Sequence, residues 1–419
     1  MHSTFLLAAA WASYTLAVPV TLPEAQNEGF TVPVVHTPNT KRDPLSAMYQ
    51  AYQRYGDGIE MPAALLEFAN NLQSDGKTHQ KRQDSASVAA TPTSKDVEYW
   101  CPVQVGVNTL NLNFDTGSNA LWVFSSVTPA DQRGSHNLYT PNGRSLKKLG
   151  YTWSIGYADG SKAAGVVYMD KVQIGSATVT SQAVQAATSV SSKFVSKSGI
   201  DGLLGLGYSA FNNVSPQRSG TWFANAMSSL RSGVFTADLR PGAVGAYTFG
   251  FIDPERYTGS ITYQALHSSA LSKGWWLIDA SKGYKVGTQQ FTDTAGSSNG
   301  AVLDTGTTLL LMSDQVVKTY YSKVPSSQYV ASRGGWVFPC SATLPDIQVP
   351  FGSSFATIPG KYMNYVALDS QNVSCFGSLQ SLGSQNTALP YIYGDIFFKA
   401  NYVVFDMKND KVGFATKKN

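Results

Sequence analysis

Two aspartates lie in nearly identical sequence settings. The segment Leu112–Phe124, LNFDTGSNALWVF, contains Asp115, and Ala301–Leu311, AVLDTGTTLLL, contains Asp304. Burying a carboxylate among apolar residues is costly unless it is hydrogen-bonded or shares its charge, and the Thr-Gly after each aspartate supplies a turn and a hydroxyl. If the two turns face each other, the carboxylates cannot both ionise, and they hold one proton between them at acid pH. One then acts as a base toward water and the other as an acid toward a carbonyl oxygen, which predicts general acid–base hydrolysis.

The two halves of the chain share a second feature at a fixed distance from each aspartate. The run Leu203-Leu204-Gly205 ends 90 residues after Asp115, and the run Tyr391-Ile392-Tyr393-Gly394 ends 90 residues after Asp304. An apolar run that ends in glycine is typical of a strand passing close to another backbone. The spacing therefore predicts a diverged duplication with one carboxylate in each copy.

These segments resemble the pepsin-like aspartic endopeptidases, and within them the secreted fungal enzymes of the penicillopepsin and aspergillopepsin type. The resemblance runs from about Glu98 to the C-terminus. It rests on five motifs, which are Asp115-Thr116-Gly117-Ser118 with Trp122, Tyr157-Ala158-Asp159-Gly160-Ser161, Asp201-Gly202-Leu203-Leu204-Gly205-Leu206-Gly207, Asp304-Thr305-Gly306-Thr307-Thr308 and Gly394-Asp395-Ile396-Phe397. It implies an all-β, bilobal pepsin-like fold, with two duplicated β lobes at residues 83–257 and 258–419 and a cleft between them.

The resemblance also implies an activity. Asp115 and Asp304 would activate a water molecule to hydrolyse peptide bonds in protein and peptide substrates, preferring large apolar residues. Ser118 and Thr307 stand where the family's hydroxyls hydrogen-bond the catalytic pair, and Trp122 resembles the tryptophan whose ring nitrogen binds a flap tyrosine. The remaining support residues are Thr116, Gly117, Thr305 and Gly306, and Thr308 is expected among the substrate-binding residues. Asn119-Ala120 departs from the commoner pattern, which has an acid before Leu-Trp, and we expect little chemical consequence.

The segment Tyr151–Asp170 predicts a hairpin around Ala158-Asp159-Gly160. By resemblance it is the flap that closes over substrate, with Tyr157 pressing on the cleft. Ala158 replaces the family's usual glycine. In fungal relatives an acid at the position of Asp159 lets the P1 pocket accept Lys, whereas without the family Asp159-Gly160 is simply a good turn pair.

The N-terminal region predicts an exported precursor. Residues 1–17 have an apolar run and small residues before a cleavage point, as a secretory signal does, although the positive start is nearly absent. Residues 18–82 resemble a propeptide that would inhibit the enzyme. It begins extended, continues with two helical stretches at Asp43–Tyr55 and Pro62–Leu72, and ends at the dibasic pair Lys81-Arg82. A flexible linker with a chance dibasic pair is the alternative.

In pepsin-like zymogens a basic propeptide side chain lies against the catalytic pair. Lys41, Arg54 and Lys77 are the candidates, and the sequence does not choose among them. The mature region is basic, with a net charge of +5 from Gln83 onward by our count of the printed sequence. Its basic residues are scattered, so a solvated surface explains them better than nucleic-acid binding does. We expect a secreted monomer with no membrane segment.

Cysteines and sequons add four sites. By resemblance Cys340 and Cys375 form the family's C-lobe disulfide, which a secretory context permits, and Cys101 is left as a buried free thiol. Asn213-Val214-Ser215 and Asn372-Val373-Ser374 are glycosylation sequons, the first weakened by Pro216. Strand-like segments are expected at Glu98–Val107 and Leu110–Phe114 around Asn108-Thr109, and helices at Thr221–Leu230 and at Asp314–Lys323 after a Ser313 cap.

Other chemistries lack the necessary residues. After Lys81-Arg82 the only histidines are His136 and His267, and no base–nucleophile signature stands beside either. His-Glu-x-x-His, Cys-x-x-Cys and P-loop motifs are absent, so no metal or cofactor is expected. A two-carboxylate glycosidase would not predict the 90-residue repeat. An inactive binding protein of the same fold would be expected to have lost one of the two aspartates, and neither is lost.

Overall fold

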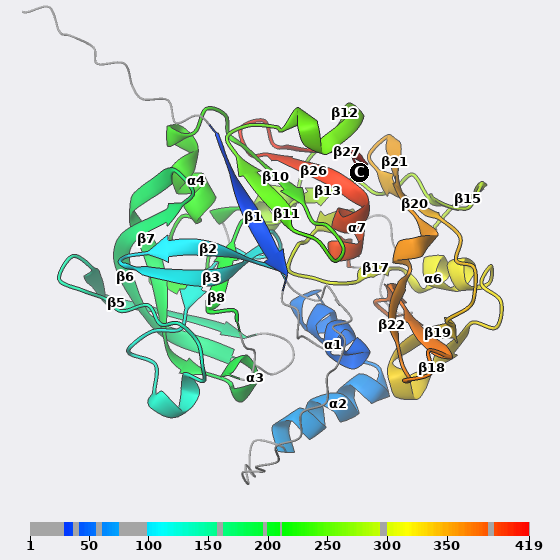
Figure 1. The fold of residues 1–419 in the computed structure, drawn as a ribbon, viewed down its shortest axis with the longest axis horizontal. Helices are drawn as coiled ribbons and strands as arrows, with labels where there is room; N and C mark the ends of the chain where they lie inside the picture. Colours follow the sequence, from blue (N-terminus) through cyan, green and yellow to red (C-terminus); the bar gives the residue numbers. More distant parts are fainter. Residues whose placement is uncertain are drawn as a thin grey trace, which may run out of the picture.

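The computed structural model describes residues 29–36, 42–55, 61–74, 99–156, 162–195, 199–209, 212–293, 300–383 and 389–418. Strands dominate these residues, as the all-β prediction requires, and they form one large sheet and three smaller ones. Figure 1 shows two β-rich halves, one coloured cyan to green and one yellow to orange, with the last strands in red between them.

The large sheet contains fourteen strands in the order β12-β27-β26-β10-β11-β1-β2-β3-β8-β4-β7-β6-β5-β9. Their bounds are β1 Phe30–His36, β2 Tyr99–Val105, β3 Asn108–Asp115, β4 Leu121–Val123, β5 Leu146–Gly156, β6 Lys162–Ile174, β7 Ala177–Val190, β8 Gly202–Gly205, β9 Val214–Ser215, β10 Val234–Asp238, β11 Gly245–Phe249, β12 Tyr257–Ala265, β26 Asn401–Asp406 and β27 Lys411–Lys417. The C-terminal strands β26 and β27 thus pair with β10 and β12 from the middle of the chain, so one sheet joins the two halves.

The smaller sheets belong to the second half of the chain. Their strands are β13 Leu277–Ile278, β14 Tyr284–Val286, β15 Gln289–Phe291, β16 Ala301–Leu303, β17 Leu310–Met312, β18 Gln328–Val330, β19 Gly335–Pro339, β20 Ile347–Phe351, β21 Ser354–Ile358, β22 Asn364–Ala367, β23 Ser374–Gly377, β24 Leu379–Ser381 and β25 Tyr391–Tyr393. The sheet β13-β16-β25-β17-β24 is the one that leads into Asp304.

The described helices are short. They are α1 Pro44–Tyr55, α2 Ala63–Ser74, α3 Ser192–Val195, α4 Trp222–Ala226, α5 Ala270–Lys273, α6 Asp314–Tyr321 and α7 Asp395–Ala400. The predicted Ser313 cap is confirmed, because its side chain accepts a bond from the Val316 N–H. Thr221, expected inside a helix, caps α4 instead, and its side chain accepts a bond from the Ala224 N–H. No helix in the described parts of the chain is long and apolar enough to cross a membrane.

The strand pairing repeats around each aspartate. β3 lies parallel to β8, with Asp115 opposite Gly205, and β16 lies parallel to β25, with Leu303 opposite Tyr393. The next strands, β4 and β17, run antiparallel to β8 and β25. A Cβ on Gly205 or Gly394 would overlap backbone atoms near the residue five positions after each aspartate. The 90-residue repeat is therefore confirmed as a repeated strand–turn–strand unit, and its glycines are required by close backbone approach.

One predicted turn is displaced. The hairpin between β2 and β3 turns at Gly106 and Val107, not at Asn108-Thr109, and Asn108 already pairs with Val105 in the ladder. Gly106 has φ +61°, and a Cβ there would overlap the Asp170 carboxylate. Glycine adopts this left-handed conformation without steric cost, so the turn forms where glycine is available.

The N-terminal region is folded onto both halves. β1 pairs with β11 along Phe30–Val34 and with β2 at Val35 and His36, so a segment expected only to be extended is a strand of the large sheet. The two predicted helices are confirmed as α1 and α2, which lie at the lower centre of Figure 1. The buried face of α1 forms one cluster with residues of the second half, among them Leu309, Tyr365 and Ile392.

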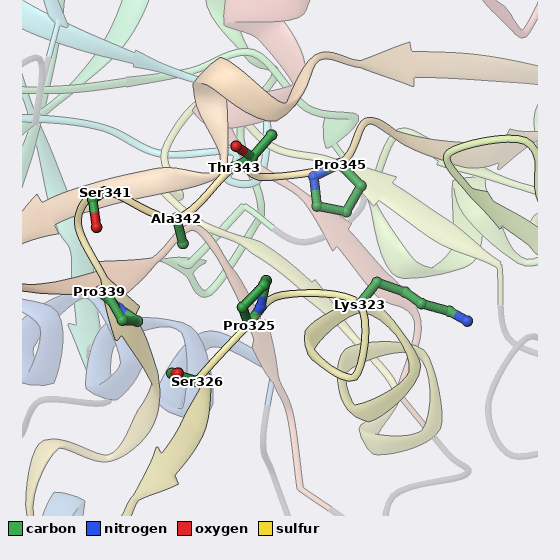
Figure 2. A pocket seen from close by; sticks show the side chains of 8 residues that line it. All are labelled: Lys323, Pro325, Ser326, Pro339, Ser341, Ala342, Thr343 and Pro345. Carbon is green, nitrogen blue, oxygen red and sulfur yellow. The ribbon is translucent and has the colours of Figure 1, made fainter.

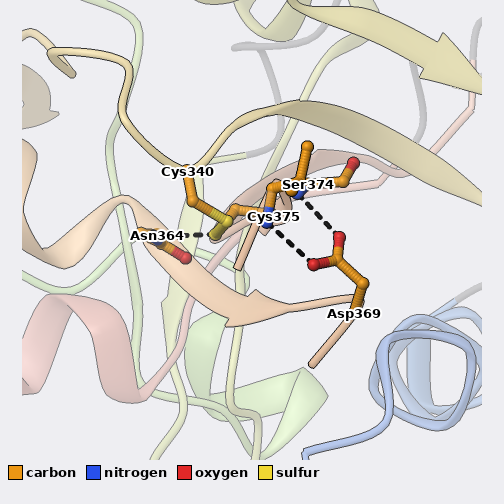
Figure 3. Close-up of a disulfide and its surroundings, with 6 residues drawn as sticks. Cys340, Asn364, Asp369, Ser374 and Cys375 are labelled. Carbon is orange, nitrogen blue, oxygen red and sulfur yellow. Dashed lines mark hydrogen bonds between the residues drawn. A yellow bond between two sulfur atoms is a disulfide. The ribbon is translucent and has the colours of Figure 1, made fainter. Parts of the chain in front are cut away.

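The cysteines follow the prediction. Cys340 and Cys375 form a disulfide at the end of β19 and within β23, and the side-chain amide of Asn364 lies against the Cys375 sulfur (Figure 3). Cys101 is a free thiol in β2 and is fully buried. Burial raises the pKa of this thiol well above its ordinary value, which keeps it protonated and unreactive.

Candidate active site

The two Asp-Thr-Gly turns interlock through their threonines. The Thr116 hydroxyl donates to the Leu303 carbonyl at 2.9 Å, and the Thr305 hydroxyl donates to the Phe114 carbonyl at 2.7 Å. Each hydroxyl oxygen also accepts the backbone N–H of the other threonine, at 3.1 and 3.0 Å. All four bonds are buried, so they are strong and costly to break. This symmetric arrangement joins the ends of β3 and β16 and brings the two turns together.

The glycines of the turns hold the carboxylates. Gly117 N–H donates to Oδ1 of Asp115 at 2.9 Å, and Gly306 N–H donates to Oδ1 of Asp304 at 2.8 Å. Gly117 also lies directly against the Asp304 carboxylate, because a Cβ at this position would overlap all three of its atoms. Both aspartate side chains have no solvent exposure. One glycine thus contacts both carboxylates, which places the pair in a common buried site.

The two hydroxyls expected to support the pair behave differently. Thr307 Oγ1 donates a short hydrogen bond to Oδ2 of Asp304. Ser118 Oγ is buried without a hydrogen-bond partner among the described residues, so the expected bond from Ser118 to Asp115 is not formed there. Oδ1 of Asp115 is held instead by the backbone of Gly117. Thr308 lies one residue further on, and its carbonyl accepts the Ile396 N–H from α7.

A tyrosine of α1 reaches the second aspartate. The Tyr55 hydroxyl donates a 2.7 Å hydrogen bond to Oδ2 of Asp304, across 249 positions of sequence. The Tyr55 ring is buried and packs edge-on against Trp275, with the ring centroids 5.4 Å apart. The helical spacing marked Tyr55 only as an apolar-face residue. Its phenol group was the one available signal, since a buried hydroxyl needs a hydrogen-bond partner.

The three basic residues considered for this position remain untested. Lys41 and Lys77 lie outside the described residues, and the side chain of Arg54 is not described. In the described part of α1 the group that reaches Asp304 is therefore a neutral hydroxyl. Arg42, just before α1, instead donates to the Tyr365 carbonyl and stacks over the Tyr365 ring.

Trp122 is buried in the first half of the chain, 2 % exposed. Its ring packs against Trp153 of β5 and Phe194 of α3 at centroid distances of 6.1 and 5.2 Å. The two flap strands, β5 and β6, are confirmed as an antiparallel pair. The predicted tip residues Tyr157, Ala158 and Asp159 lie outside the described residues, so the expected Trp122–Tyr157 bond stays a prediction.

The two sequons have different surroundings. Asn213 is engaged on both sides of its amide, since Nδ2 donates to the Ser154 carbonyl at 2.9 Å and Oδ1 accepts from Gln185 at 2.6 Å. Asn372 is exposed, in a turn where Asp369 accepts the N–H groups of Val373 and Ser374 (Figure 3). Asn372 is thus exposed at the surface, whereas the Asn213 amide is engaged by neighbouring groups.

A surface hollow lies apart from the aspartate pair. It has a volume of about 680 Å³ and lies between the segment that follows α6 and the loop that connects β19 to β20 (Figure 2). Its lining residues are Lys323, Pro325, Ser326, Pro339, Ser341, Ala342, Thr343 and Pro345. None of them belongs to the Asp-Thr-Gly turns or to α1. Within the described residues, no group of three or more His, Cys, Asp or Glu side chains could hold a metal ion.

Comparisons with known proteins agree with this geometry. A family model described as eukaryotic aspartyl protease matches residues 98–417. Aspergillopepsin-1 of Aspergillus oryzae is 42% identical over 419 residues, which is all of this chain and all of that protein. Penicillopepsin-3 of Penicillium janthinellum is 41% identical over 95% of each chain.

A solved structure supports the fold independently. The crystal structure of an aspartic proteinase from Irpex lacteus superposes with a TM-score of 0.64, covering 77% of this chain and 95% of that one at 24% identity. At 24% identity this structure supports the fold alone. The activity is assigned from the family model and from the relatives of higher identity. The chain therefore belongs to the eukaryotic aspartyl protease family and is a pepsin-like aspartic endopeptidase.

Proposed function

We propose that this chain is the precursor of a secreted acid endopeptidase in which Asp115 and Asp304 are the catalytic residues. The observation that carries the proposal is the pair of interlocked turns, with Gly117 in contact with both carboxylates. Two buried carboxylates this close share one proton at acid pH, because two negative charges would repel each other strongly.

The reaction needs only this pair and water. The ionised member takes a proton from a bound water, which attacks the scissile carbonyl carbon, while the protonated member donates to the carbonyl oxygen. The product of this step is a neutral tetrahedral diol. The C–N bond then breaks as the nitrogen receives a proton, and a free amine and a carboxylic acid are released. No covalent enzyme intermediate is formed.

The turns supply the preorganisation that this chemistry needs. The Gly117 and Gly306 N–H groups and the Thr307 hydroxyl hold three carboxylate oxygens. Oδ2 of Asp304, which Tyr55 also contacts, faces α1. Groups fixed before substrate arrives need not reorganise during the reaction, which is a principal source of catalysis.

Residues 18–82 act as an inhibitory propeptide in this proposal. α1 places the Tyr55 hydroxyl on Asp304 and its ring on Trp275, in the space that a substrate side chain and its scissile carbonyl would need. The mature enzyme is released by cleavage after Lys81-Arg82, which lies outside the described residues. Signal cleavage after residue 17 and export complete the maturation, and the mature enzyme acts as a monomer.

The proposed substrates are proteins with large apolar residues around the scissile bond. The apolar cluster that receives α1 supports this, since it already accommodates Met48, Tyr52 and Tyr55. Acceptance of Lys at P1 would come from Asp159 at the flap tip. Cleavage of matched peptides with Lys, Leu or Ser at P1 tests this, and Asp159→Asn should reduce cleavage after Lys alone.

The decisive experiment is casein cleavage against pH by the processed protein, with Asp304→Asn and Asp314→Asn in parallel. Asp314 is a surface carboxyl of α6 that pairs with Lys318, so its variant is the control for loss of a carboxylate. We expect cleavage below about pH 6 in the wild type and the control, and none in Asp304→Asn. Equal cleavage in all three proteins would refute the catalytic pair, and absence of cleavage in a folded, processed wild type would favour a binding role.

A further inference from the structure

Asn119 connects the first catalytic turn to the second half of the chain. It follows Asp115 by four residues and is 7 % exposed. Its side-chain Nδ2 donates to the Gly274 carbonyl at 3.1 Å and to the Tyr208 carbonyl. Both amide hydrogens are thus used, which is the full donor capacity of an asparagine. Its own backbone carbonyl accepts from Asn212 Nδ2 at 2.8 Å.

The Gly274 carbonyl is a point of convergence between the two halves. It accepts from Asn119 and also from the Tyr208 backbone N–H at 3.1 Å. Gly274 ends α5 in the left-handed conformation, with φ +70°, which glycine adopts without strain. Its position is therefore set by α5 on one side and by two donors from the first half on the other.

Trp275 follows immediately and forms the surface against which the Tyr55 ring packs. The next residue, Trp276, accepts the Leu303 N–H at 3.0 Å, and Leu303 precedes Asp304. Trp276 also donates from its ring to the Leu206 carbonyl at 2.9 Å, and the Leu206 N–H donates to the Asp115 carbonyl at 2.8 Å. The segment 274–276 is thus bonded to the backbone beside both aspartates.

We propose that Asn119 is a positioning residue that holds Trp275 at a fixed place relative to the catalytic pair and so sets the preference for an aromatic substrate residue next to the scissile bond. The proposal rests on the proposed function, in that substrate occupies the space where Tyr55 lies. The threonine interlock fixes the two aspartates, and Trp276 and Leu206 add a second link. Neither connects the Asp115 turn directly to the Gly274 carbonyl, and Asn119 does.

The test compares Asn119→Ala with a control that loses the same kind of bonds elsewhere. Asn401 is 4 % exposed, and its Nδ2 donates to the Thr357 and Phe397 carbonyls, both within the second half. Asn401→Ala therefore removes two amide bonds of the same type without touching Trp275. Each processed enzyme is assayed with pairs of peptides. The two peptides of a pair differ in one residue next to the scissile bond, which is Tyr in one and Ala in the other. One pair varies the residue before the bond, and a second pair varies the residue after it.

We expect the wild type and Asn401→Ala to prefer the Tyr peptide to the same extent. Asn119→Ala should lose about two- to tenfold of this preference, which is the effect of one or two neutral hydrogen bonds. The lost preference should appear as a higher KM for the Tyr peptide, while kcat for the Ala peptide changes less than about twofold. If Asn119 had a merely structural role, its replacement would lower the fraction of active enzyme. Cleavage of both peptides would then fall equally, and the Tyr/Ala ratio would be unchanged.

A second variant adds a pH signature. In Asn119→Asp an ionised carboxylate would face two carbonyl oxygens and repel them, whereas its protonated form donates one hydrogen bond. The Tyr/Ala ratio of this variant should therefore fall as pH rises across the range of a carboxyl group, relative to the wild type at each pH. This variant also decides the question if Asn119→Ala does not fold.

Three outcomes would overturn the proposal. These are an unchanged Tyr/Ala ratio in both Asn119 variants, a loss of the ratio in Asn401→Ala equal to that in Asn119→Ala, and a wild type that cleaves without preferring the aromatic peptide. Failure of the proposed function looks different, since a wild type that cleaves no peptide, or cleaves independently of Asp304, would refute the catalytic assignment itself.

Discussion

The Tyr55 hydroxyl lies 2.7 Å from Oδ2 of Asp304 and donates a hydrogen bond to it. Thr307 donates to the same oxygen, so this carboxylate oxygen accepts from a group of its own turn and from a group of α1. A basic residue was expected to contact the pair, and in the described part of α1 a neutral donor does so. The contact can be removed without altering the helix.

Tyr55→Phe should weaken latency. The variant loses one hydrogen bond to a carboxylate, worth about 1.5–3 kcal/mol, while the ring packing on Trp275 is kept. We expect the purified precursor to convert to mature enzyme about tenfold faster than the wild type at a fixed acid pH. Gel analysis of precursor against time measures this. Tyr52→Phe is the control, since Tyr52 is equally buried in α1 and packs in the same apolar cluster. Equal rates for all three would show that the Tyr55 bond does not hold the propeptide.

Thr307→Val should shift the pH dependence of cleavage. The hydroxyl bond to Asp304 favours the ionised carboxylate, and valine has the same shape without the donor. Loss of the bond destabilises the ionised form of Asp304, so the kcat/KM profile of the coupled pair should move to higher pH. Thr357→Val, an exposed threonine in β21, should leave the profile unchanged. A profile of Thr307→Val that coincides with the wild type would contradict the role of the hydroxyl.

Asp238 should contribute stability that persists into acid conditions. Burial alone would raise its pKa, but the ammonium of Lys417 and the guanidinium of Arg240 outweigh burial and hold the pKa below its ordinary value. The side chain of Asp238 is fully buried. Its carboxylate lies 3.0 Å from a side-chain nitrogen of each of three basic residues, Lys417, Arg240 and Arg256. A lowered folded-state pKa gives stability that is present above the unfolded value of about 3.9 and is lost as pH falls through the lowered pKa.

The corresponding measurement is urea unfolding of Asp238→Asn at pH 5.5 and near pH 2. At pH 5.5 the variant should lose about 3–5 kcal/mol, because it leaves the largely buried ammonium of Lys417 without its partner. The difference from the wild type should shrink as the pH falls through the lowered pKa of Asp238, where the wild-type carboxylate is itself protonated. Asp253→Asn, which removes a partly exposed partner of Arg256, should cost less than about 1 kcal/mol. A loss independent of pH would argue against the charge interaction.

One of the two sequons should carry a glycan. Asn372 is exposed in a tight turn, whereas the Asn213 amide is bonded to Ser154 and Gln185 and is followed closely by Pro216. We expect the secreted protein to lose the mass of one N-glycan on enzymatic deglycosylation. Asn372→Gln should abolish this change, and Asn213→Gln should preserve it. A glycan on Asn213 would mean that the sequon is modified before its side chain becomes engaged.

Sequence alone was sufficient for the features that depend on neighbouring residues. Each Asp-Thr-Gly turn and the two N-terminal helices follow from local spacing, because backbone preference and side-chain periodicity act over a few positions. The helices were predicted at Asp43–Tyr55 and Pro62–Leu72 and lie at 44–55 and 63–74. The 90-residue repeat could be recognised because each half carries the same two local motifs at the same distance. The hydroxyl of Thr307 and the disulfide of Cys340 and Cys375 were also predictable, by resemblance to a family whose motifs this chain retains.

Tertiary structure decided the contacts between distant segments. Tyr55 looked like a core residue of an amphipathic helix, and Asn119 looked like an inert departure from a family pattern. Their partners, Asp304 and the Gly274 carbonyl, lie 249 and 155 positions away. The placement of β1 between β11 and β2, and of β26 against β10, belongs to the same group. Such contacts depend on how whole strands and helices pack, and local sequence does not encode which buried donor will meet which acceptor.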